Sequence, residues 1–433
     1  MDFADFILQH EGDDLPRLAL SRSRYGAGVP DWDLALTTLE VRGKLRSKVP
    51  QWYAVPSLHY PLKLSAEQCS SAETARYKAS VALSAVREGV SSEICGRPWP
   101  HEWEGPAPEA WEGQGAKRRW ISEETPFRIA DLTGGLGVDA WAFSEVFSEV
   151  LYNEMKPELA AAAAHNFKEL GAGNVKVQCA EVKAGEVAVL LGGFHPDILF
   201  LDPARRAGDG RKVFRLEDCQ PNVLELLPEL LSACPKVLLK LSPMADITLV
   251  CRQLGCVRAV HVVAAEGECK ELLLVLDKEH AGPYTLTVNE SGAVADIAVS
   301  ETDALLLAGK ECQERCRWLF EPGKALLKAG AFAWPCSYGL AKLSRHTHLY
   351  LAERPVPELA PFGKWLEILE WKAFNKQSFK EISAKYPQAE LLARNVPVGT
   401  EELRRRLKLQ DGGPVRIYAT KTETGNYLII CKL

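Results

Sequence analysis

Residues 131–139 read Asp131-Leu132-Thr133-Gly134-Gly135-Leu136-Gly137-Val138-Asp139, and this Gly-rich stretch decides the fold of the central part of the chain. The apolar run before it, 128–132, has the length of a buried strand, and the residues after it have helical spacing. Glycine lets a backbone turn tightly and lets a ligand approach closely, while the first turn of a helix presents unpaired N–H groups. The stretch therefore predicts a strand, a tight turn and a helix that together form a cofactor-binding loop.

Short apolar runs separated by helical stretches extend outward from this loop, over about residues 127–277. The runs are 128–132, 150–153, 175–179, 198–201, 237–241, 259–263 and 272–276. Strands that alternate with helices predict an α/β fold with a doubly wound, Rossmann-like sheet. The last two runs are separated only by 264–271, which is too short for a helical crossover. We therefore expect this pair to form an antiparallel hairpin at one edge of the sheet.

The flanking regions have other patterns and divide the chain into four predicted parts. Up to about residue 96 the pattern is helical, with helices at 31–45 and from 65 to 90, and the Pro-, Gly- and Trp-rich stretch 97–124 predicts an irregular linker. After residue 277, strands at 284–288 and 295–299 and helices near 304–307 and 323–328 predict a small α+β domain. The last part has strands at 365–371, 415–420 and 427–431 and helices from 378 and at 401–409. The predicted boundaries are 1–115, 116–280, 281–360 and 361–433.

Composition excludes some classes of function and leaves others open. The chain starts with acids instead of a basic signal-peptide region and has no run of about 18 apolar residues, so we expect a cytoplasmic protein without a membrane partner. Its twelve cysteines lack the spacing of zinc ligands, so we expect reduced thiols and no metal. The net charge of -5 is unevenly distributed, because residues from Arg315 onward carry 20 Lys and Arg against 11 Asp and Glu. A basic C-terminal part suits contact with a polyanion such as RNA, although ordinary solvated helices can have the same composition.

Two types of cofactor fit the Gly-rich loop. Residues 135–140 also match the G-x-G-x-x-A pattern of dinucleotide sites, so the glycines alone do not choose between the types. A pyrophosphate on this loop would face the carboxylates of Asp131 and Asp139, and like charges at close range in a cleft are costly. S-adenosylmethionine has no phosphate and carries a sulfonium and an ammonium group, which these acids attract. We therefore expect S-adenosylmethionine, with a nicotinamide cofactor as the alternative, and the predicted ligands in the loop are Asp131, Thr133, Gly134, Gly135, Gly137 and Asp139.

The ends of later strands add candidate cofactor ligands. Glu154 follows the second strand, about twenty residues beyond the loop, where both types of cofactor need a carboxylate for ribose hydroxyls. Met155 either packs on the adenine face or lies in the core. Glu181 follows the third strand and either contacts the adenine or is exposed to solvent.

The candidate catalytic residues follow the fourth strand, in Leu201-Asp202-Pro203-Ala204-Arg205-Arg206. Ligands bind at the carboxyl ends of the strands in such a sheet. The side chain of Asp202 and the carbonyls around Pro203 can accept hydrogen bonds from an exocyclic amine and orient its nitrogen. Lys240 and Ser242, at the end of the fifth strand, either contact the substrate or pair with a carboxylate.

This part of the chain resembles class I methyltransferases with an (Asp/Asn)-Pro-Pro-aromatic motif, which methylate nitrogen and include RNA guanine-N2 enzymes. The resemblance rests on residues 131–139 and on Asp202-Pro203-Ala204-Arg205. Ala204 replaces the second proline and Arg205 replaces the aromatic residue that stacks on the target base, so the acceptor atom stays open. An arginine can stack through its guanidinium or hold phosphate, and Arg205 and Arg206 are therefore predicted contacts of nucleic acid.

The 5-methyluridine enzymes, with an Asp-Pro-Pro-Arg motif, are a further similar group, but they need a cysteine nucleophile after the fifth strand. Residues 240–246 of this chain contain no cysteine. Cys269, near the expected hairpin, is either such a nucleophile or a buried and inert thiol.

A second resemblance spans nearly the whole chain. The segments 67–78, 241–244, 268–272 and 321–330 are similar to a bacterial family of methyltransferases with a THUMP-like C-terminal domain. The resemblance implies a helical N-terminal part, a Rossmann-like core, a small ferredoxin-like domain and a terminal THUMP-like domain that includes 394–397 and 401–409. THUMP domains proper bind RNA, so the resemblance also implies tRNA or rRNA as the substrate.

Two polar segments have open roles. Arg404 and Arg405 belong to a basic run, 404–408, that either contacts RNA phosphates or pairs with Glu401 and Glu402 one turn earlier in the same helix. The polar residues of 68–78 form either a lid near the cofactor or a capped contact between helices.

Together these features predict an S-adenosylmethionine-dependent methyltransferase that acts on RNA by direct, in-line transfer. Asp202, Pro203 and Arg205 are predicted to orient the acceptor. The predicted substrate contacts are Arg206, Lys240, Ser242, Arg404 and Arg405. The alternatives are a nicotinamide-dependent oxidoreductase and a non-catalytic RNA-binding protein that retains the methyltransferase fold.

Overall fold

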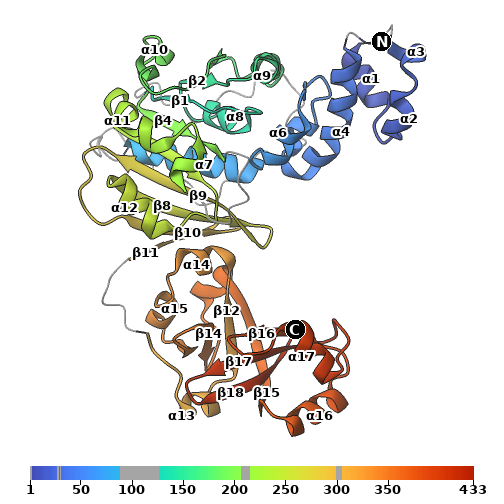
Figure 1. Cartoon of the computed structure of the whole chain (residues 1–433), viewed down its shortest axis with the longest axis vertical. Helices are drawn as coiled ribbons and strands as arrows, with labels where there is room; N and C mark the ends of the chain where they lie inside the picture. The colour runs from blue at the N-terminus through green and yellow to red at the C-terminus, as the bar shows by residue number, and fades with distance from the viewer. Residues whose placement is uncertain (1, 27–28, 30, 88–125, 206–214, 299–304) are drawn as a thin grey trace. The chain divides into compact units, whose positions relative to one another are not determined.

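The computed structural model of the chain describes residues 2–26, 29, 31–87, 126–205, 215–298 and 305–433 (Figure 1). These residues form two compact units. The first comprises Met1–Ala259 and Leu272–Gly282, and the second comprises Val260–Glu271 and Pro283–Leu433. The predicted linker 97–124 lies outside the described residues. In the part of the chain that is described, no helix is long and apolar enough to cross a membrane.

The first unit begins with a helical region, as predicted from its sequence. Its helices are α1 (Phe3–Gln9), α2 (Leu15–Ala19), α3 (Arg22–Tyr25), α4 (Trp32–Lys48), α5 (Pro50–Tyr53), α6 (Lys63–Gln68) and α7 (Ala72–Arg87). The prediction of one continuous helix from residue 65 is wrong, because α6 and α7 are separated by three residues. The hydroxyl of Ser71 accepts a hydrogen bond from the N–H of Thr74 (3.2 Å), which caps the start of α7. Serine side chains compete for backbone hydrogen bonds in this way, so the pair Ser70-Ser71 interrupts the helix.

The sheet of the first unit confirms the predicted alternation of strands and helices. Its parallel strands are β1 (Arg128–Asp131), β2 (Glu149–Asn153), β3 (Val175–Gln178), β4 (Ile198–Leu201) and β7 (Lys236–Leu241), in the order β3-β2-β1-β4-β7. The helices along this part of the chain are α8 (Val138–Ser144), α9 (Pro157–Glu169), α10 (Val187–Leu191), α11 (Val223–Ala233) and α12 (Ile247–Leu254) (Figure 1). All four residues of β4 are buried, which explains why this strand is an uninterrupted apolar run.

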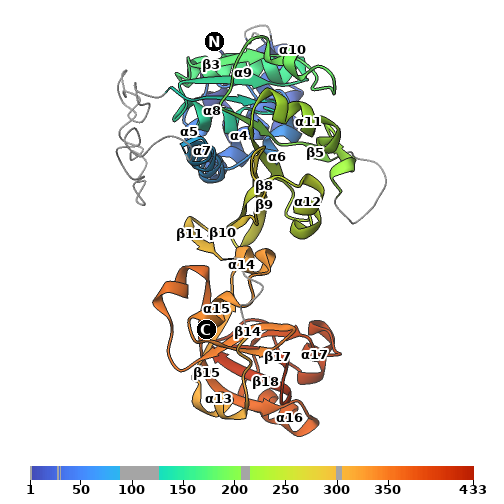
Figure 2. The same cartoon turned by 90° about the vertical axis from the view of Figure 1, so that its left-hand side faces the viewer.

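The predicted hairpin is formed by β8 (Val257–Ala265) and β9 (Glu268–Asp277). Glu266 and Gly267 form its two-residue turn, both with positive φ (54° and 77°), as such tight turns require. Its predicted position at the sheet edge is wrong, because β10 (Thr285–Glu290) and β11 (Ala293–Ile297) continue the strand order as β7-β9-β8-β10-β11 (Figure 2). These two strands were expected in a separate α+β domain. Their alternating sequence predicts strands, but it does not show which strand they pair with.

The second unit contains a seven-stranded sheet with the order β13-β14-β12-β15-β18-β17-β16. Its strands are β12 (Trp318–Pro322), β13 (Ala341–Ser344), β14 (Thr347–Ala352), β15 (Gly363–Ala373), β16 (Glu390–Arg394), β17 (Val415–Thr422) and β18 (Gly425–Lys432). Its helices are α13 (Lys310–Arg315), α14 (Lys324–Ala329), α15 (Trp334–Ser337), α16 (Lys376–Lys385) and α17 (Thr400–Leu407). The predicted boundary at 360–361 therefore separates two neighbouring strands, β12 and β15, of one continuous sheet. The helix expected near 304–307 is wrong, because Leu307 forms an isolated parallel bridge with Lys342.

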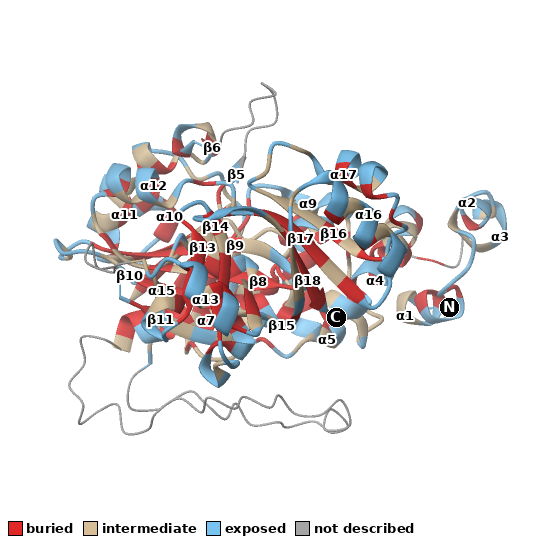
Figure 3. Cartoon of the chain, turned by 90° about the horizontal axis from the view of Figure 1, so that it is seen from below, coloured by how far each residue is buried: buried red, intermediate tan, exposed pale blue. Residues whose placement is uncertain are grey.

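Both faces of this second sheet are covered. Along β17 and β18, alternate residues belong to two different core clusters, as the period of two in a strand requires. Tyr418 and Ile429 belong to one cluster, and Ile417 and Leu428 belong to the other, which also contains Leu403 of α17. Figure 3 shows buried residues concentrated on the strands and exposed residues along the outer faces of α16 and α17.

Candidate active site

Three glycines shape the loop between β1 and α8, for two different physical reasons. Gly135 and Gly137 have φ values of 55° and 94°, in the left-handed region that favours glycine. Gly134 has an ordinary φ, but a Cβ at this position would lie 2.1 Å from Cε2 of Tyr152. The ring of Tyr152 therefore lies directly against the loop, and its hydroxyl donates a hydrogen bond to the carbonyl of Gly135 (2.5 Å).

Asp131 lies at the end of β1 and is fully buried. One carboxylate oxygen accepts a hydrogen bond from the N–H of Thr133 (3.1 Å), and the other has no hydrogen-bond partner among the described residues. Burial raises the pKa of Asp131 well above its usual range, and the nearby charge of Asp139 adds to this effect. The loop thus contains a buried carboxyl group with one unused oxygen, which a cationic ligand would stabilise in its charged form.

Glu154 follows β2 and joins the loop to that strand end. One of its carboxylate oxygens accepts a hydrogen bond from the N–H of Gly135, and the other accepts one from the N–H of Lys156, both at 2.9 Å. Asn153, which precedes it, donates hydrogen bonds from Nδ2 to the carbonyls of Leu132 (3.1 Å) and Ala180 (3.0 Å). The structure therefore brings Glu154 to the loop, and its contact with the ribose remains a prediction.

The sequence analysis missed Tyr152 and Asn153. They lie in the same strand end as Glu154, and an aromatic residue and an amide directly before a predicted ribose ligand could have indicated a supporting role. Their contacts with the loop join residues far apart in the sequence, and strand pairing, not local pattern, determines those contacts.

The two predicted adenine contacts differ in their surroundings. Met155 is 48% exposed, so the alternative that it belongs to the core is wrong. Glu181 is exposed and forms an ion pair with Lys183 (3.0 Å). Within the described residues, no hydrogen bond or ion pair connects Glu181 to the loop. Its adenine contact remains a prediction without geometric support.

Asp139 faces the N-terminal region. Its carboxylate accepts a hydrogen bond from Oγ of Ser70 (2.9 Å) and forms an ion pair with Nζ of Lys78 (3.3 Å), which is completely buried. Asp139 thus connects α8 to α7, and its direct contact with the cofactor remains a prediction. The capped contact between helices, one of the two alternatives for residues 68–78, is therefore present.

A second contact holds the other end of α8 against α7. The guanidinium of Arg76 forms two hydrogen bonds with the carboxylate of Glu145 (3.0 and 3.2 Å) and lies over the ring of Trp141 (5.1 Å to the centroid). Residues 57–59 are also bound to α9, because the side-chain amide of Asn166 makes hydrogen bonds with the backbone of His59. The N-terminal region therefore packs against α8 and α9, the helices that follow β1 and β2.

Asp202 and Lys240 form an ion pair, which is one of the two alternatives predicted for Lys240. Nζ of Lys240 in β7 contacts a carboxylate oxygen of Asp202 (2.5 Å). The N–H of Asp202 donates to Oγ1 of Thr133 (2.7 Å), which links the end of β4 to the Gly-rich loop. Ser242 accepts a hydrogen bond from the N–H of Met244 (3.3 Å) and so closes a turn after β7. Asp202 is partly exposed and can accept a hydrogen bond from a ligand.

The residues after Asp202 are described only in part. Pro203 is buried, and Arg205 lies in the short strand β5 (Ala204–Arg205), which pairs with β6 (Cys219–Gln220). Arg206 lies outside the described residues. Cys269 lies in β9, and burial raises its pKa to about 11, which favours the inert thiol over the nucleophile.

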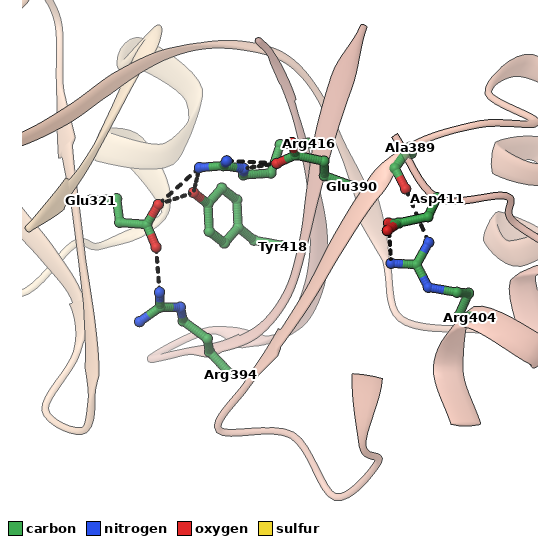
Figure 4. A network of polar contacts seen from close by, with 8 residues as sticks. All are labelled: Glu321, Ala389, Glu390, Arg394, Arg404, Asp411, Arg416 and Tyr418. Carbon is green, nitrogen blue, oxygen red and sulfur yellow. Dashed lines mark hydrogen bonds and ion pairs between the residues drawn. The ribbon is translucent and has the colours of Figure 1, made fainter. Parts of the chain in front are cut away.

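The arginines of α17 have different surroundings, and Figure 4 shows those of Arg404. Arg404 forms an ion pair with Asp411 (2.8 Å) and donates to the carbonyl of Ala389 (3.3 Å), so its role is structural. Arg406 forms an ion pair with Glu402, in agreement with the alternative in which the acidic residues of the helix pair with its own arginines. Arg405 is exposed and has no ion pair with any described residue, so it is the arginine of this run that can reach a phosphate.

A partly buried polar network in the second unit was not predicted from the sequence (Figure 4). The carboxylate of Glu321 in β12 binds the guanidinium groups of Arg394 and Arg416 and accepts a hydrogen bond from the hydroxyl of Tyr418 (2.7 Å). Arg416 also binds Glu390. The network joins β12 to β16 and β17, strands that lie in different predicted domains.

Comparison with known proteins relates the chain to methyltransferases along most of its length. A protein from Porphyromonas gingivalis W83 that is described as a methyltransferase, and whose crystal structure is known, is 29% identical in sequence to this chain. The two structures have a TM-score of 0.75, and the match covers 99% of this chain and 97% of that chain. An uncharacterized S-adenosylmethionine-dependent methyltransferase of Mycobacterium tuberculosis is 26% identical over 307 residues, which is 69% of this chain and 78% of the relative.

Two domain models match the second unit. Residues 318–359 match a ferredoxin-like domain, and residues 363–433 match a domain described as THUMP domain-like. Both spans lie within the part of the chain that forms the seven-stranded sheet, and they confirm that ferredoxin-like and THUMP-like regions are present. The chain therefore has the fold of class I methyltransferases, with ferredoxin-like and THUMP-like regions at its C-terminal end.

Proposed function

We propose that this protein is an S-adenosylmethionine-dependent methyltransferase that acts on RNA, with tRNA or rRNA as the substrate class. The relative from M. tuberculosis is named as an S-adenosylmethionine-dependent enzyme, which supports the choice of cofactor. The observation that carries the proposal is the buried carboxyl group of Asp131, with one oxygen that has no hydrogen-bond partner among the described residues.

The residues of the loop fit S-adenosylmethionine better than a dinucleotide. A buried carboxylate with an unused oxygen stabilises a cation and repels a phosphate, and S-adenosylmethionine has two cationic groups and no phosphate. Asp139 adds little to this discrimination, because Lys78 already pairs with it. When bound, the cofactor supplies a methyl group on a positively charged sulfur.

The remaining ligands follow from the same geometry. Nothing lies within 4 Å of a Cβ position at Gly135, so this part of the loop leaves space for the methionine part of the cofactor, while Gly134 and Gly137 let the loop pack against Tyr152 and Phe167. Glu154 already holds the loop through the N–H of Gly135, and its remaining lone pairs can accept ribose hydroxyls. Met155 is exposed beside it and can pack on the adenine face.

On the acceptor side, Asp202 is the residue that orients the reacting group. The ion pair with Lys240 and the hydrogen bond to Thr133 fix its carboxylate and backbone close to the loop. Its exposed oxygen can accept a hydrogen bond from an N–H or O–H of the acceptor, and this positions the lone pair of the acceptor atom. Lys240 then acts as a positioning residue for Asp202, and Pro203 and Arg205, which follow Asp202 in the sequence, are the other residues proposed to orient the acceptor.

RNA as the substrate is supported by the THUMP-like region and by charge. Residues from Arg315 onward have an excess of nine positive charges, and Arg405 is exposed on α17. Phosphate contacts by such side chains supply most of the affinity for RNA when no base is read.

Calorimetric titration of the full chain tests the cofactor. S-adenosylhomocysteine is expected to bind, NADH is expected not to bind, and Asp131→Asn should weaken the binding of S-adenosylhomocysteine. Binding of NADH without binding of S-adenosylhomocysteine would instead support a nicotinamide-dependent oxidoreductase. The further alternative, a non-catalytic RNA-binding protein, predicts binding of RNA without transfer of a methyl group to it.

A further inference from the structure

Two sulfur atoms lie in contact in the second unit, away from the loop and Asp202 in the sequence. Cys312 lies in α13, and Cys316 follows the last residue of that helix and donates its N–H to the carbonyl of Cys312 (2.9 Å). The two Sγ atoms are 3.4 Å apart. Among the eleven cysteines that the structure describes, no other two are joined by a sulfur–sulfur hydrogen bond.

The two thiols have different surroundings. Cys316 is buried in a core cluster, whereas Cys312 is partly exposed. The hydrogen bond with the Cys316 thiol, together with the charge of Arg315, lowers the pKa of Cys312 to about 7 against the opposing effects of burial and of Glu353. The same hydrogen bond and burial raise the pKa of Cys316. An accessible, partly ionised thiol therefore lies beside a buried, protonated one, which is the arrangement that thiol–disulfide exchange requires.

The backbone allows these sulfur atoms to approach further. An S–S bond is about 2.05 Å long, so the Sγ atoms need to move closer by about 1.4 Å. Cys316 has extended backbone angles (φ −74°, ψ 138°) and lies outside the regular helix. The helix itself is held by hydrogen bonds between Gln313 and Thr424 (3.0 and 3.1 Å). Bond formation therefore needs a local adjustment at Cys316 and leaves α13 in place.

We propose that Cys312 and Cys316 form a dithiol site that a low-molecular-weight disulfide, such as oxidised glutathione, converts into an intramolecular disulfide. The thiolate of Cys312 attacks one sulfur of the glutathione disulfide, which forms a mixed disulfide and releases one glutathione thiolate. Cys316 then loses its proton to water, and its thiolate attacks Sγ of Cys312. This second step forms the Cys312–Cys316 bond and releases the second glutathione thiolate. Counted from the dithiol, in which Cys312 has first lost its proton to water, the protein gives up two electrons and two protons; glutathione disulfide takes up the electrons, and the two released glutathione thiolates take up two protons from water.

The experiment uses the full chain in buffers of increasing ratio of oxidised to reduced glutathione. After blocking of free thiols with N-ethylmaleimide under denaturing conditions, tryptic peptides are identified by mass spectrometry. Trypsin cleaves after Lys310, Arg315 and Arg317, so the disulfide joins peptide 311–315 to peptide 316–317. We expect this linked pair to accumulate as the ratio rises and to disappear after reduction with dithiothreitol.

The pair Cys251 and Cys256 is a matched control in the same sample. These residues are also close in sequence, but burial raises the pKa of Cys251 to about 11 and also raises that of Cys256. They lie in different tryptic peptides, separated by the cleavage after Arg252. We expect both to remain labelled by N-ethylmaleimide at ratios that oxidise Cys312 and Cys316.

Two variants separate the steps of the exchange. Cys316→Ser should stop after the first step and accumulate one glutathione on Cys312, whereas Cys312→Ser should acquire none at Cys316. Circular dichroism checks that each variant is folded. The proposal is overturned if both thiols of the folded wild type stay labelled by N-ethylmaleimide, or if the control pair is oxidised equally. Accumulation of glutathione on Cys316 in Cys312→Ser would also overturn it.

Discussion

In the proposed function, the carboxyl group of Asp131 selects the ligand of the loop and makes its binding depend on pH. Its pKa is raised in the ligand-free protein, so part of the population is protonated at pH values above the usual pKa of an aspartic acid. A cation next to the free oxygen favours the charged form. We therefore expect S-adenosylhomocysteine, through its ammonium group, to release a proton on binding and to bind more weakly as the pH falls.

Calorimetry in buffers of different ionisation enthalpy measures this proton release. Asp131→Asn should abolish the release and weaken binding by about tenfold or more, because a hydrogen bond to a charged group contributes about 1.5–3 kcal/mol. The same variant should be more stable without ligand at neutral pH. A carboxyl group with a raised pKa stabilises the fold below its unfolded pKa and loses that contribution as the pH rises towards the folded value. An unchanged proton release in Asp131→Asn would contradict this role.

Gly134 is predicted to be intolerant of any side chain. The Cβ of an alanine would lie 2.1 Å from the buried ring of Tyr152, and this ring is rigid and has no space to move within the packed strand end. We expect Gly134→Ala to lower the free energy of unfolding by about 1–3 kcal/mol, as overpacking of a core does. Urea denaturation measures the change. Gly173→Ala is the control, because nothing lies within 4 Å of a Cβ there, and an equal loss in both variants would disprove the steric account.

At the scale of elements, α7 is part of the methyltransferase unit. Ser70 and Lys78 hold Asp139 at the start of α8, and Arg76 holds Glu145 at its end. The first turn of α8 is continuous with the Gly-rich loop, so the position of the loop depends on contacts made by a helix about sixty residues earlier in the chain.

Removal of the Lys78 charge should therefore destabilise the fold. Lys78→Met leaves the carboxylate of Asp139 in a largely buried position without its ion pair, and we expect a loss of about 3 kcal/mol in the free energy of unfolding. The same substitution at Lys176, which pairs with Glu149 at the surface, should cost less than about 1 kcal/mol. The double variant Lys78→Met/Asp139→Asn should recover part of the loss. If it recovers nothing in a double-mutant cycle, the ion pair is not the cause.

Most strands could be predicted from the sequence, because the buried strands of a parallel sheet are uninterrupted apolar runs such as 198–201. The loop, Glu154 and the pair Asp202–Lys240 could also be predicted, because strand ends lie at one edge of such a sheet. The partners of Asp139 could not, because tertiary packing decides which helix covers α8. The break at 69–71 and the continuation of the sheet by β10 and β11 were missed for similar reasons, since local patterns do not show partners.

At the scale of the whole molecule, charge separates the catalytic part from the C-terminal part. Residues from Arg315 onward have 20 Lys and Arg against 11 Asp and Glu, whereas the whole chain has a net charge of -5. Many of these cations are used internally, as Arg394, Arg404 and Arg416 show. Only cations without such partners can bind the phosphates of RNA. The number of basic residues is therefore larger than the number of phosphate contacts that we expect.

Arg405 and Arg406 allow a direct test of this distinction. Arg405→Gln should weaken RNA binding by the full chain and reduce the slope of log affinity against log salt concentration by about 1, as expected for the loss of one phosphate contact. Arg406→Gln should have a smaller effect, because Arg406 is paired with Glu402 on the same helix. Fluorescence anisotropy with labelled tRNA at several salt concentrations measures both slopes. Equal slopes for Arg405→Gln and the wild type would show that α17 does not contact the phosphates.

The most direct test of the central claim is transfer of a labelled methyl group. Tritiated S-adenosylmethionine is incubated with the protein and with total RNA from a strain that lacks the gene, so that the target positions are unmodified. The account predicts ribonuclease-sensitive label with the wild-type protein and none with Asp202→Ala, although that variant should still bind S-adenosylhomocysteine. Absence of label with a wild-type protein that binds both S-adenosylhomocysteine and RNA would contradict the account and support a non-catalytic role.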